Sequence, residues 1–422
     1  MLNIINKTFS NFKSKIYFLK RFENYKDLKK IFSLLESKQD NKKLMLVGGC
    51  VRKFLNNEPI NDIDAATNLT PEETKEILVK HNIKFIDTGL SHGTITVIIN
   101  NIKIELTTLR KDVKTDGRHA DVKFISDWET DALRRDFTIN AIYSDFNGKI
   151  YDPLNGSKDL KKGVVKFVGD PNLRINEDYL RILRYLRFFT QYSKLDHDYA
   201  TLKAIRKNLD GLAKISKERI VDEFFKILSL KNLDNLFNNQ DSCLILSAIF
   251  PQLKYYSRLK KQNVISKTVL SKIDSVLILS IMLIDNSDST EFFLYKFKLS
   301  NKIKDRIHSL YKNYKKIKLK ELLNEKQLIK FSYFYSTQEI IDLLIFFIFV
   351  EKKIDFNIVE KKIKFLESIQ APIFPIEADF LKSEFGFSQG RELGDALKKL
   401  EKYWIDNNFN IEKKQIRNIL NL

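Results

Sequence analysis

The first 170 residues alternate between short apolar runs and turn residues, a pattern that predicts strands. The predicted strands cover residues 44–47, 94–99, 102–106 and 164–168. The turn Asn100-Asn101 joins the middle two as a hairpin. A helix is predicted over residues 71–81, since Thr70 suits the N-cap and Pro71 the first turn. This part of the chain therefore predicts a mixed α/β domain.

Beyond residue 170 the apolar positions recur every three to four residues, which is the period of amphipathic helices. The clearest helices are predicted over residues 178–192, 215–230 and 391–407. The run from Leu343 to Val350 is uncharged and indicates a buried core helix, because a membrane-spanning helix needs roughly 18 apolar residues. Together the two parts predict an α+β protein, with an α/β head followed by an all-helical remainder.

The chain is strongly basic, with 73 Lys and Arg residues against 54 Asp and Glu and a net charge of +19. This excess attracts polyanions, so nucleic acid is the leading candidate partner and an anionic membrane the lesser one. A general bias toward lysine supplies part of the charge. Within residues 301–330, ten basic residues stand against three acids, with Tyr311 and Tyr314 among them. That stretch is either a solvated helix face or a surface that follows phosphates.

Cysteine usage points to the cytoplasm as the compartment. Cys50 and Cys243 cannot build a disulfide framework and no CxxC occurs, which fits a reducing environment. The first 22 residues contain five cations and no acid. Their cations are mostly Lys, which favours a basic leading helix over a transit peptide. His197-Asp198 is followed by a single further histidine, His308, so no phosphohydrolase domain is expected.

The leading candidate for chemistry is the pair Asp62 and Asp64. On a strand, residues i and i+2 point to the same face, so the two carboxylates would project together. Like charges at that spacing need a cation between them, and Mg²⁺ binds one or two carboxylates together with substrate phosphates. A DxD pair by itself is a weak signal, since most such pairs lie in loops or helix caps.

The residues before this pair sharpen the prediction. A strand ends at Gly48-Gly49, and a helix then begins that carries Arg52. Glycines allow backbone N–H groups to approach phosphate closely, and the N-terminus of a helix adds positive potential. A guanidinium can hold phosphate with two hydrogen bonds. A Gly-Gly turn, an arginine and a DxD pair in this order predict a nucleotide site that contains a metal.

Two further groups extend the candidate site. Glu105 lies on the second strand of the hairpin and would complete the metal site if that strand neighbours the DxD strand; otherwise it is an exposed strand residue. Arg134 and Arg135 precede an apolar stretch that is predicted to begin a helix. These two arginines either bind a triphosphate or form a salt-bridged helix end.

The helix predicted over residues 178–192 places Asp178, Arg181 and Arg184 roughly on one face. These residues either pair with each other or meet the edge of a base. A carboxylate accepts from an exocyclic amino group, and a guanidinium donates to ring nitrogen and carbonyl acceptors. Cytosine and adenine both present an amino donor beside a ring-nitrogen acceptor, so the second interpretation selects C and A over U and G.

With these motifs in order, the sequence closely resembles the class II tRNA nucleotidyltransferases, the CCA-adding enzymes and their bacterial poly(A) polymerase relatives. The resemblance covers about residues 44–230 and rests on five blocks, the second of which looks most like enzymes of alphaproteobacterial type. The blocks are GGCVRKFL…NDIDAAT (48–67), TGLSHGTITV…IKIELTTLRKDVKTDGRHADV (88–122), RRDFTINAIY (134–143), DPLNGSKDL (152–160) and GDPNLRINEDYLRILRYLRF (169–188). Five motifs in this order with compatible gaps are highly specific.

The resemblance implies a role for each matching residue. Asp62 and Asp64 would bind the catalytic Mg²⁺ ions, and Asp178 and Arg181 would read the incoming base. The residues implied to hold the nucleotide and its phosphates are Gly49, Arg52, Arg135, Arg184 and Arg187. Residues 111–121 resemble the flexible loop that helps the family change from CTP to ATP.

The family also implies an architecture and a partner. A polymerase-β-like nucleotidyltransferase head would be followed by a helical neck, body and tail that grip the acceptor arm of tRNA near its 3′ end. The expected segments are a basic helical leader (1–40), the catalytic head (41–169), the neck (170–255) and the body with the tail (256–422). Near its end the chain resembles a tail segment of the family, at Gly386, Gly390, Gly394, Leu397, Leu400 and Trp404. No obligate protein partner and no membrane are expected.

The resulting prediction is template-independent addition of C, C and A to the 3′ end of tRNA from CTP and ATP, by two-metal phosphoryl transfer. Poly(A) synthesis, or addition of only A or only C, is the alternative, although residues 88–97 lack the basic run associated with the poly(A) branch. A non-catalytic tRNA-binding protein is a further alternative. Its one support is Lys53, which replaces the usual Asp of the family and so removes an acid that would orient Arg52.

Overall fold

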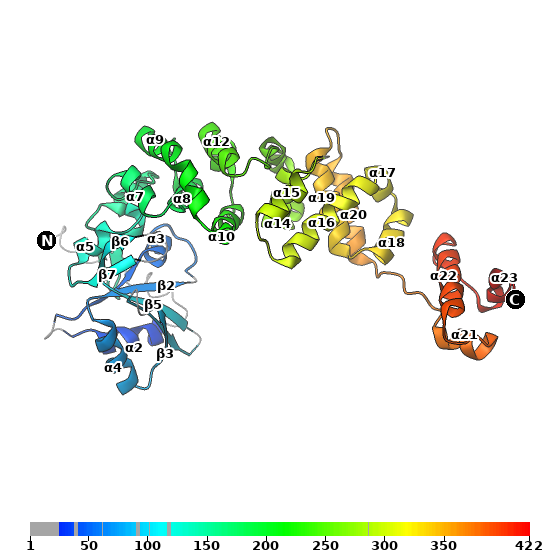
Figure 1. Ribbon diagram of the computed structural model, residues 1–422, viewed down its shortest axis with the longest axis horizontal. Coiled ribbons are helices and arrows are strands. Elements are labelled where there is room, and N and C mark those ends of the chain that lie inside the picture. Colours follow the sequence, from blue (N-terminus) through cyan, green and yellow to red (C-terminus); the bar gives the residue numbers. More distant parts are fainter. Residues whose placement is uncertain are drawn as a thin grey trace, which may run out of the picture. The chain divides into compact units, whose positions relative to one another are not determined.

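The computed structural model describes residues 25–37, 41–60, 62–89, 93–100, 102–115, 120–285 and 287–422 (Figure 1). The chain divides into two compact units, the first ending at Pro251 and the second beginning at Gln252. The basic leading helix predicted over the first 22 residues lies outside the described residues, as do residues 116–119 of the stretch that resembles a flexible loop. The predicted segment boundaries stay predictions.

A seven-stranded sheet, in the order β3-β4-β5-β2-β1-β8-β9, forms the base of the first unit. Its strands are β1 (Leu44–Val47), β2 (Ile63–Thr67), β3 (Lys84–Gly89), β4 (Thr94–Ile99), β5 (Ile102–Thr108), β8 (Tyr143–Ser144) and β9 (Ile150–Tyr151). β2 and β5 run parallel and the other neighbours antiparallel. A separate hairpin pairs β6 (Arg110–Thr115) with β7 (Ala120–Phe124). The predicted strand at 44–47 and the predicted hairpin are confirmed.

Two helices close one side of this sheet, α2 (Tyr25–Leu35) and α4 (Pro71–Lys80) (Figure 1). Leu28 and Phe32 of α2 share a core with alternate residues of the strands, because every second strand residue points to that face. The start of α4 is as predicted: the Thr70 hydroxyl accepts from the Glu73 N–H at 3.2 Å, and the Glu73 carboxylate accepts from the Thr70 N–H at 2.8 Å. This capping box satisfies two backbone donors at the helix end.

Short helices between the strands and after them complete the first unit. They are α3 (Gly49–Leu55), α5 (Trp128–Leu133), η2 (Thr138–Asn140), α6 (Gly156–Lys162), α7 (Pro171–Glu177), α8 (Arg181–Tyr192), α9 (Tyr199–Asn208), η3 (Leu209–Lys214), α10 (Lys217–Leu228), α11 (Asp234–Phe237) and α12 (Gln240–Ile249). The helix predicted over 215–230 is α10, and its N-cap is Ser216.

Two predictions for this unit are wrong. Residues 164–168 do not form a strand. Phe167 forms only an isolated bridge to Phe137, because the Lys166 carbonyl accepts from the Thr138 N–H and the Val168 N–H donates to the Asp136 carbonyl, next to η2. The helix predicted over 178–192 begins at Arg181. Asp178 instead has an extended backbone (φ −154°, ψ 106°) and ends α7, so it does not share a helix face with Arg181.

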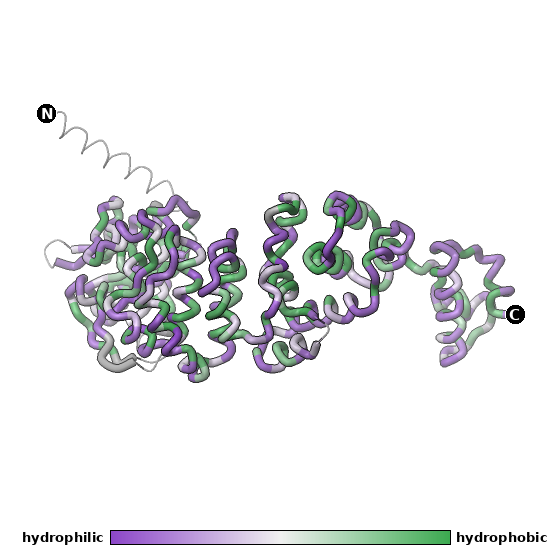
Figure 2. Tube along the Cα trace, turned by 90° about the horizontal axis from the view of Figure 1, so that it is seen from above, coloured by the Kyte–Doolittle hydropathy of each residue, from purple (hydrophilic) through white to green (hydrophobic). Residues whose placement is uncertain are grey.

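The second unit is helical throughout its described residues. Its helices are η4 (Tyr256–Val264), α13 (Lys267–Leu270), α14 (Ser275–Leu283), α15 (Ser289–Lys296), α16 (Asn301–Lys316), α17 (Leu319–Leu322), α18 (Glu325–Phe334), α19 (Thr337–Val350), α20 (Phe356–Ser368), α21 (Ala378–Phe385), α22 (Arg391–Asp406), η5 (Lys413–Gln415) and α23 (Ile416–Leu420). Hydrophobic and hydrophilic residues alternate along most of them (Figure 2). The uncharged run 343–350 is buried in α19, as predicted. Within the described ranges, no helix is long and apolar enough to cross a membrane.

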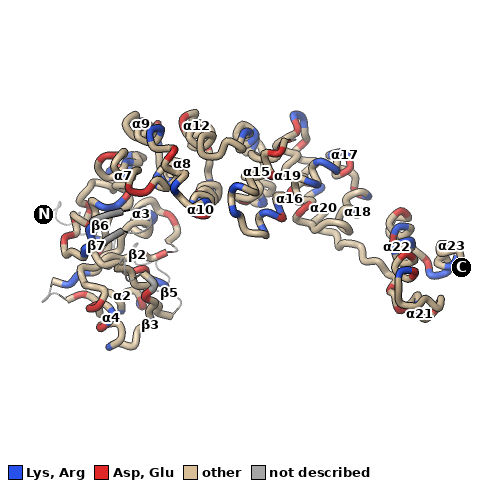
Figure 3. The backbone as a smooth tube through the Cα atoms, viewed as in Figure 1, with Lys and Arg blue, Asp and Glu red and all other residues tan. Residues whose placement is uncertain are grey.

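The basic stretch 301–330 divides into exposed cations and buried rings. Lys and Arg gather on α16 and α17, with acids among them (Figure 3). Tyr311 is buried, and the Tyr314 ring packs edge-on against Phe346 at 4.9 Å. These two tyrosines therefore belong to the core of the unit and do not offer a stacking surface, whereas Lys312 and Lys316 face solvent.

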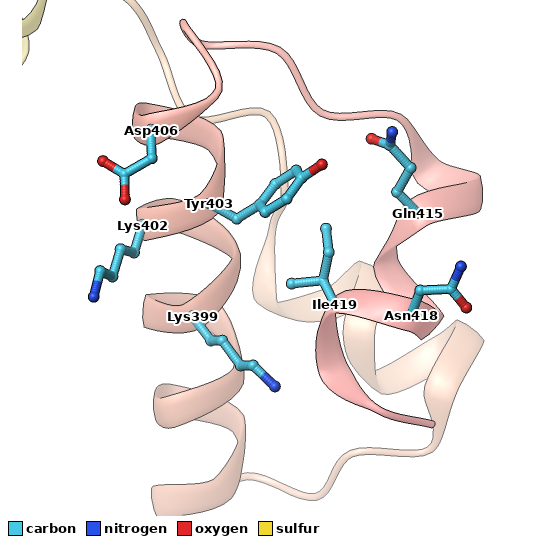
Figure 4. Close-up of a pocket in the computed structure, with 7 residues that line it drawn as sticks. All are labelled: Lys399, Lys402, Tyr403, Asp406, Gln415, Asn418 and Ile419. Atoms are coloured by element: carbon cyan, nitrogen blue, oxygen red, sulfur yellow. The ribbon is translucent and has the colours of Figure 1, made fainter.

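The last helices form a small core of their own around Leu400 and Ile416. Beside it, α22 and α23 border a shallow pocket in which Tyr403 and Ile419 face the space between the helices (Figure 4). Lys399 and Gln415 also line it. None of the residues that the sequence predicts for the chemistry lies there.

Gly211 controls how closely η3 approaches the junction between α7 and α8. A Cβ atom at Gly211 would lie 2.1 Å from the Tyr179 ring, so Gly211→Ala should force the ring beside Asp178 to move. We expect a loss of about 1–3 kcal/mol in the free energy of unfolding, which calorimetry would measure. Gly394→Ala is the matched control, because nothing lies within 4 Å of that position in α22 and alanine favours the helix. Equal stability of wild type and Gly211→Ala would contradict the close approach.

Candidate active site

The Gly48-Gly49 turn is the point around which the predicted site residues gather. Gly48 has φ +70° and ψ −122°, a backbone conformation that favours glycine, and it is the N-cap of α3. A Cβ atom at Gly48 would lie 3.7 Å from Nη1 of Arg135 and 4.0 Å from Oδ2 of Asp64. One at Gly49 would lie 3.6 Å from the same Asp64 oxygen. The turn therefore presents bare backbone to a space bounded by a carboxylate and a guanidinium.

Three carboxylates lie near the start of β2. The parallel register pairs Asp64 with Glu105 across β2 and β5, so the condition set for Glu105 is met: the two strands are neighbours. Asp62 is exposed and directly precedes β2. Burial raises the pKa of Asp64 above its ordinary value, and the charges of Glu105 and Asp62 raise it further against the opposing effect of Arg135 and Arg52. A cation would relieve this repulsion.

Asp62 and Asp64 offer hard oxygen ligands of the kind that Mg²⁺ takes up with substrate phosphates and water. Among the described residues, no group of three or more His, Cys, Asp or Glu side chains is placed to hold a metal. Glu105 adds negative charge beside the pair, and its role as a third metal ligand stays a prediction. The residues present fit a magnesium site that the substrate completes.

Arg52 is almost fully buried, with 5% of its surface exposed. Its guanidinium lies over the Phe188 ring at 4.6 Å and the Tyr192 ring at 5.1 Å, both from α8. It donates from Nη1 to the side-chain oxygen of Asn140. A buried cation of this kind is tolerated because aromatic faces and a hydrogen bond replace part of its hydration.

Arg135 is held from behind by a buried acid. Asp131 is fully buried and accepts from Nη2 of Arg135 at 3.1 Å, from Nε of Arg134 at 2.8 Å and from the Tyr143 hydroxyl at 2.7 Å. Burial opposes ionisation of Asp131, but the two guanidinium groups outweigh it and lower the pKa to about 2. The arginines end α5 instead of beginning a helix, which corrects the predicted start. The salt-bridged helix end is thus observed, and it keeps Arg135 beside Gly48.

A chain of hydrogen bonds runs from Arg52 to α8. Asn140 accepts from Arg52 and donates from Nδ2 to Oδ1 of Asp136 at 2.8 Å. The other Asp136 oxygen accepts from Nε of Arg184 at 2.8 Å. Although burial would raise it, the pKa of Asp136 is held well below its usual range by Arg184 and Asn140. Arg184 therefore binds a protein carboxylate here.

The predicted base-reading pair lies at the junction of α7 and α8. Oδ2 of Asp178 accepts from Nη2 of Arg219, on α10, at 2.8 Å. Arg181 pairs with Glu177 and also donates to the Arg174 carbonyl at 2.9 Å. Asp178 and Arg181 thus have separate partners, and the expectation that they pair with each other is not met.

Arg187 completes the set of α8 arginines. Its Nε donates to the buried carboxylate of Glu223 on α10, and its guanidinium lies 4.3 Å from the Phe188 ring centroid. Burial lowers the pKa of Arg187, which Glu223 opposes. Arg187 is therefore an anchor between two helices.

The sequence analysis missed the partners of these predicted site residues. Asp131, Asp136, Asn140, Arg219 and Glu223 all hold a predicted site residue in place. A signal existed for some of them: Asp131 and Arg135 stand four apart, as do Asp136 and Asn140. That spacing brings side chains together on a helical turn.

Comparison with known proteins decides the family. A model described as the poly A polymerase head domain matches residues 44–166, and one described as the probable RNA and SrmB-binding site of polymerase A matches residues 196–257. The mitochondrial CCA tRNA nucleotidyltransferase 1 of Mus musculus is 34% identical over 407 residues, which cover 93% of this chain and 89% of the mouse protein. The chain belongs to the CCA tRNA nucleotidyltransferase family. It is therefore a nucleotidyltransferase, as the sequence predicted.

Other CCA tRNA nucleotidyltransferases agree with this assignment. The Danio rerio protein is 46% identical over 202 residues, which cover 47% of each chain. A crystal structure of the Bacillus stearothermophilus CCA-adding enzyme in complex with CTP has the same fold, with a TM-score of 0.71, 24% identity, and coverage of 95% of this chain and 98% of that one. The predicted fold class, an α/β nucleotidyltransferase head followed by helices, is confirmed.

Acid should unfold the first unit partly through Asp131. Its pKa is lowered from 3.8 to about 2, so its stabilising effect is complete above about pH 4 and is lost as the pH falls toward 2. Asp131→Asn should cost about 3 kcal/mol in the free energy of unfolding at pH 7, because two guanidinium groups lose their buried partner. The difference from wild type should narrow by about 2 kcal/mol near pH 2.

Urea unfolding between pH 2 and 7 measures this difference. Glu129→Gln, an exposed carboxylate on the same helix, is the control and should show little change at any pH. A difference for Asp131→Asn that does not depend on pH would contradict the ion-pair interpretation.

Proposed function

We propose that this protein adds C, C and A to the 3′ end of tRNA from CTP and ATP, without a nucleic-acid template. The observation that carries the proposal is the 34% identity to the mouse CCA tRNA nucleotidyltransferase across 93% of this chain. The gathering of Asp64, Arg52 and Arg135 around the Gly48-Gly49 turn supports it, because these groups suit a nucleoside triphosphate.

Asp62 and Asp64, at the start of β2, would determine where on the nucleotide the reaction takes place. Asp62 and Asp64 would hold Mg²⁺, which lowers the pKa of the attacking 3′-hydroxyl and stabilises the leaving pyrophosphate. Glu105 adds negative charge beside Asp62 and Asp64 and so increases the electrostatic attraction of this site for a cation. The backbone of Gly48 and Gly49 leaves room for phosphate oxygens close to these carboxylates.

The buried arginines would hold the triphosphate by charge and geometry. Arg135 is held by Asp131 and Arg52 by Asn140. Side chains held in this way lose less conformational entropy on binding, and positioning with charge neutralisation supplies most of the rate of phosphoryl transfer. Asn140, on η2, orients Arg52 although position 53 holds Lys in place of the usual Asp of the family.

Base selection is assigned to Asp178 and Arg181, in the same unit. Both lie at the α7–α8 junction, where Arg219 and Glu177 hold their side chains. Asp178 would accept from the amino group of cytosine or adenine, and Arg181 would donate to the ring-nitrogen acceptor. Arg184 and Arg187 would support them through Asp136 and Glu223.

The partner and the compartment follow from charge and composition. The net charge of +19 and the exposed lysines of α16 suit a polyanion such as tRNA. Two free cysteines suit a reducing compartment, and the cytoplasm remains the proposed location.

Loss of Asp64 should separate catalysis from tRNA binding. Asp64→Ala should reduce incorporation of CTP and ATP by about a thousandfold or more, which is the scale for losing charge stabilisation in phosphoryl transfer. Binding of tRNA, measured by filter retention, should stay unchanged. The control is Asp87→Ala, an exposed carboxylate on β3 paired with Lys75, which should keep full activity.

The same assay separates the alternative functions. A tRNA lacking its 3′ end is incubated with Mg²⁺ and each labelled nucleotide, and product length and sequence are read. Addition of C, C and A supports the proposal, a long A tract indicates poly(A) synthesis, and a single nucleotide type indicates a partial relative. No incorporation by wild-type protein would leave the tRNA-binding alternative.

Arg181 should control which bases are accepted. Arg181→Ala should relax discrimination against UTP and GTP by about 5- to 150-fold, because a base-specific contact contributes about 1–3 kcal/mol. Competition between labelled nucleotides measures the ratio. Arg206→Ala removes an exposed arginine paired with Asp241 and serves as the control. Unchanged fidelity in Arg181→Ala would refute its assigned role.

A further inference from the structure

The end of α3 places Glu58 by backbone hydrogen bonding. Asn57 has a left-handed backbone (φ +58°), the Glu58 N–H donates to the Lys53 carbonyl at 2.8 Å, and the Asn57 N–H donates to the Phe54 carbonyl at 3.2 Å. This pair of bonds is the Schellman arrangement, in which the chain reverses directly after a helix. The position of the Glu58 side chain is therefore set by the last turn of the helix that carries Arg52.

The Glu58 carboxylate reaches from α3 to α8. Its Oε2 accepts from Nε2 of Gln191 at 2.9 Å and from the Tyr192 hydroxyl at 3.2 Å. Oε1 accepts from Nδ2 of Asn56 at 2.5 Å. One half-buried carboxylate thus fixes two consecutive side chains at the end of the helix that bears the base-reading arginine.

Tyr192 connects this carboxylate to Arg52. Its ring lies 5.1 Å from the Arg52 guanidinium, which also contacts the Phe188 ring at 4.6 Å, and its hydroxyl donates to Glu58 at 3.2 Å. A ring whose hydroxyl is hydrogen-bonded keeps its orientation, and an aromatic face held in place attracts a guanidinium beside it. Nε of Arg52 is buried and has no partner, so Asn140 and Tyr192 carry much of the orientation of this cation.

We propose that Glu58 is a positioning residue for the nucleotide site: it holds the Tyr192 hydroxyl, and the Tyr192 ring in turn holds the Arg52 guanidinium near the Gly48-Gly49 turn. The inference rests on the proposed function, since it takes Arg52 to bind the nucleotide phosphates. It also identifies an acid that serves Arg52 although position 53 is lysine. Glu58 supplies this acid from the next turn of the chain, with the tyrosine as the intermediate.

A purely structural tie between α3 and α8 makes a different prediction. Such a tie would depend equally on Gln191 and Tyr192, because both donate to the same Glu58 oxygen. Gln191→Ala removes one of these bonds without touching the tyrosine ring or hydroxyl. It is therefore the matched control for Tyr192→Phe, which keeps an aromatic ring and removes the hydroxyl by which Glu58 holds that ring.

The experiment compares Glu58→Gln, Tyr192→Phe, Gln191→Ala and the double variant Glu58→Gln/Tyr192→Phe. For each we would measure KM and kcat for CTP and ATP on tRNA lacking its 3′ end, the Kd of CTP without tRNA, and the Tm. Glu58→Gln and Tyr192→Phe should each raise KM and Kd about fivefold, as for loss of one hydrogen bond, with kcat within about twofold. The double variant should match the single variants, because both break one chain. Gln191→Ala should leave KM and Kd at wild-type values.

Three results would overturn the proposal for Glu58: unchanged KM and Kd in Glu58→Gln, an equal effect of Gln191→Ala on these constants, or effects that multiply in the double variant. These results are distinct from a failure of the proposed function. If wild-type protein incorporates no nucleotide, the function is wrong, while the Kd of CTP still reports whether Glu58 orients Arg52.

Discussion

The buried carboxylate of Asp136 is the interaction on which the first unit depends. It accepts from Asn140, which holds Arg52 of α3, and from Arg184 of α8. An ionised group in this position is costly to bury unless it is paired and hydrogen-bonded. Its partners come from a helix before the sheet is complete and from a helix after it. The helix that follows the Gly48-Gly49 turn and the helix that carries the proposed base-reading arginine are therefore joined through one charged group.

Asp131 has the same role for Arg135, and Glu223 for Arg187. In each case an arginine proposed to bind the substrate is paired with a protein acid. Such pairing keeps a guanidinium in place and lowers the cost of holding like charges together. The excess of cations over acids in the chain thus does not describe this site, where most arginines are already neutralised. The free positive charge lies largely on exposed lysines, such as those of α16.

The sequence was sufficient for the strand that ends before Gly48 and for the capped helix α4, because these depend on local patterns. It was insufficient where tertiary contacts override periodicity. Residues 164–168 have the composition of a strand, but Phe167 packs at 4.6 Å on Phe137 and pairs only through an isolated bridge. The apolar period also continues through Asp178, although the helix does not. Some partners of the predicted site residues come from distant positions, Arg219 for Asp178 and Glu223 for Arg187, and one sequence carries no record of such pairings.

The extended backbone of Asp178 means that helix geometry does not set the distance from Asp178 to Arg181. On one continuous helix, the distance between Asp178 and Arg181 would be fixed by helix geometry and would survive any change elsewhere. Here Asp178 ends α7 and Arg181 begins α8. Their separation is maintained by the ion pair of Asp178 with Arg219 and by the close packing of the Tyr179 ring on Gly211. The spacing of the proposed base-reading pair is therefore a property of the packing behind it. If these residues read the base as proposed, substitutions in α10 and η3 can change nucleotide choice while the two residues themselves stay the same.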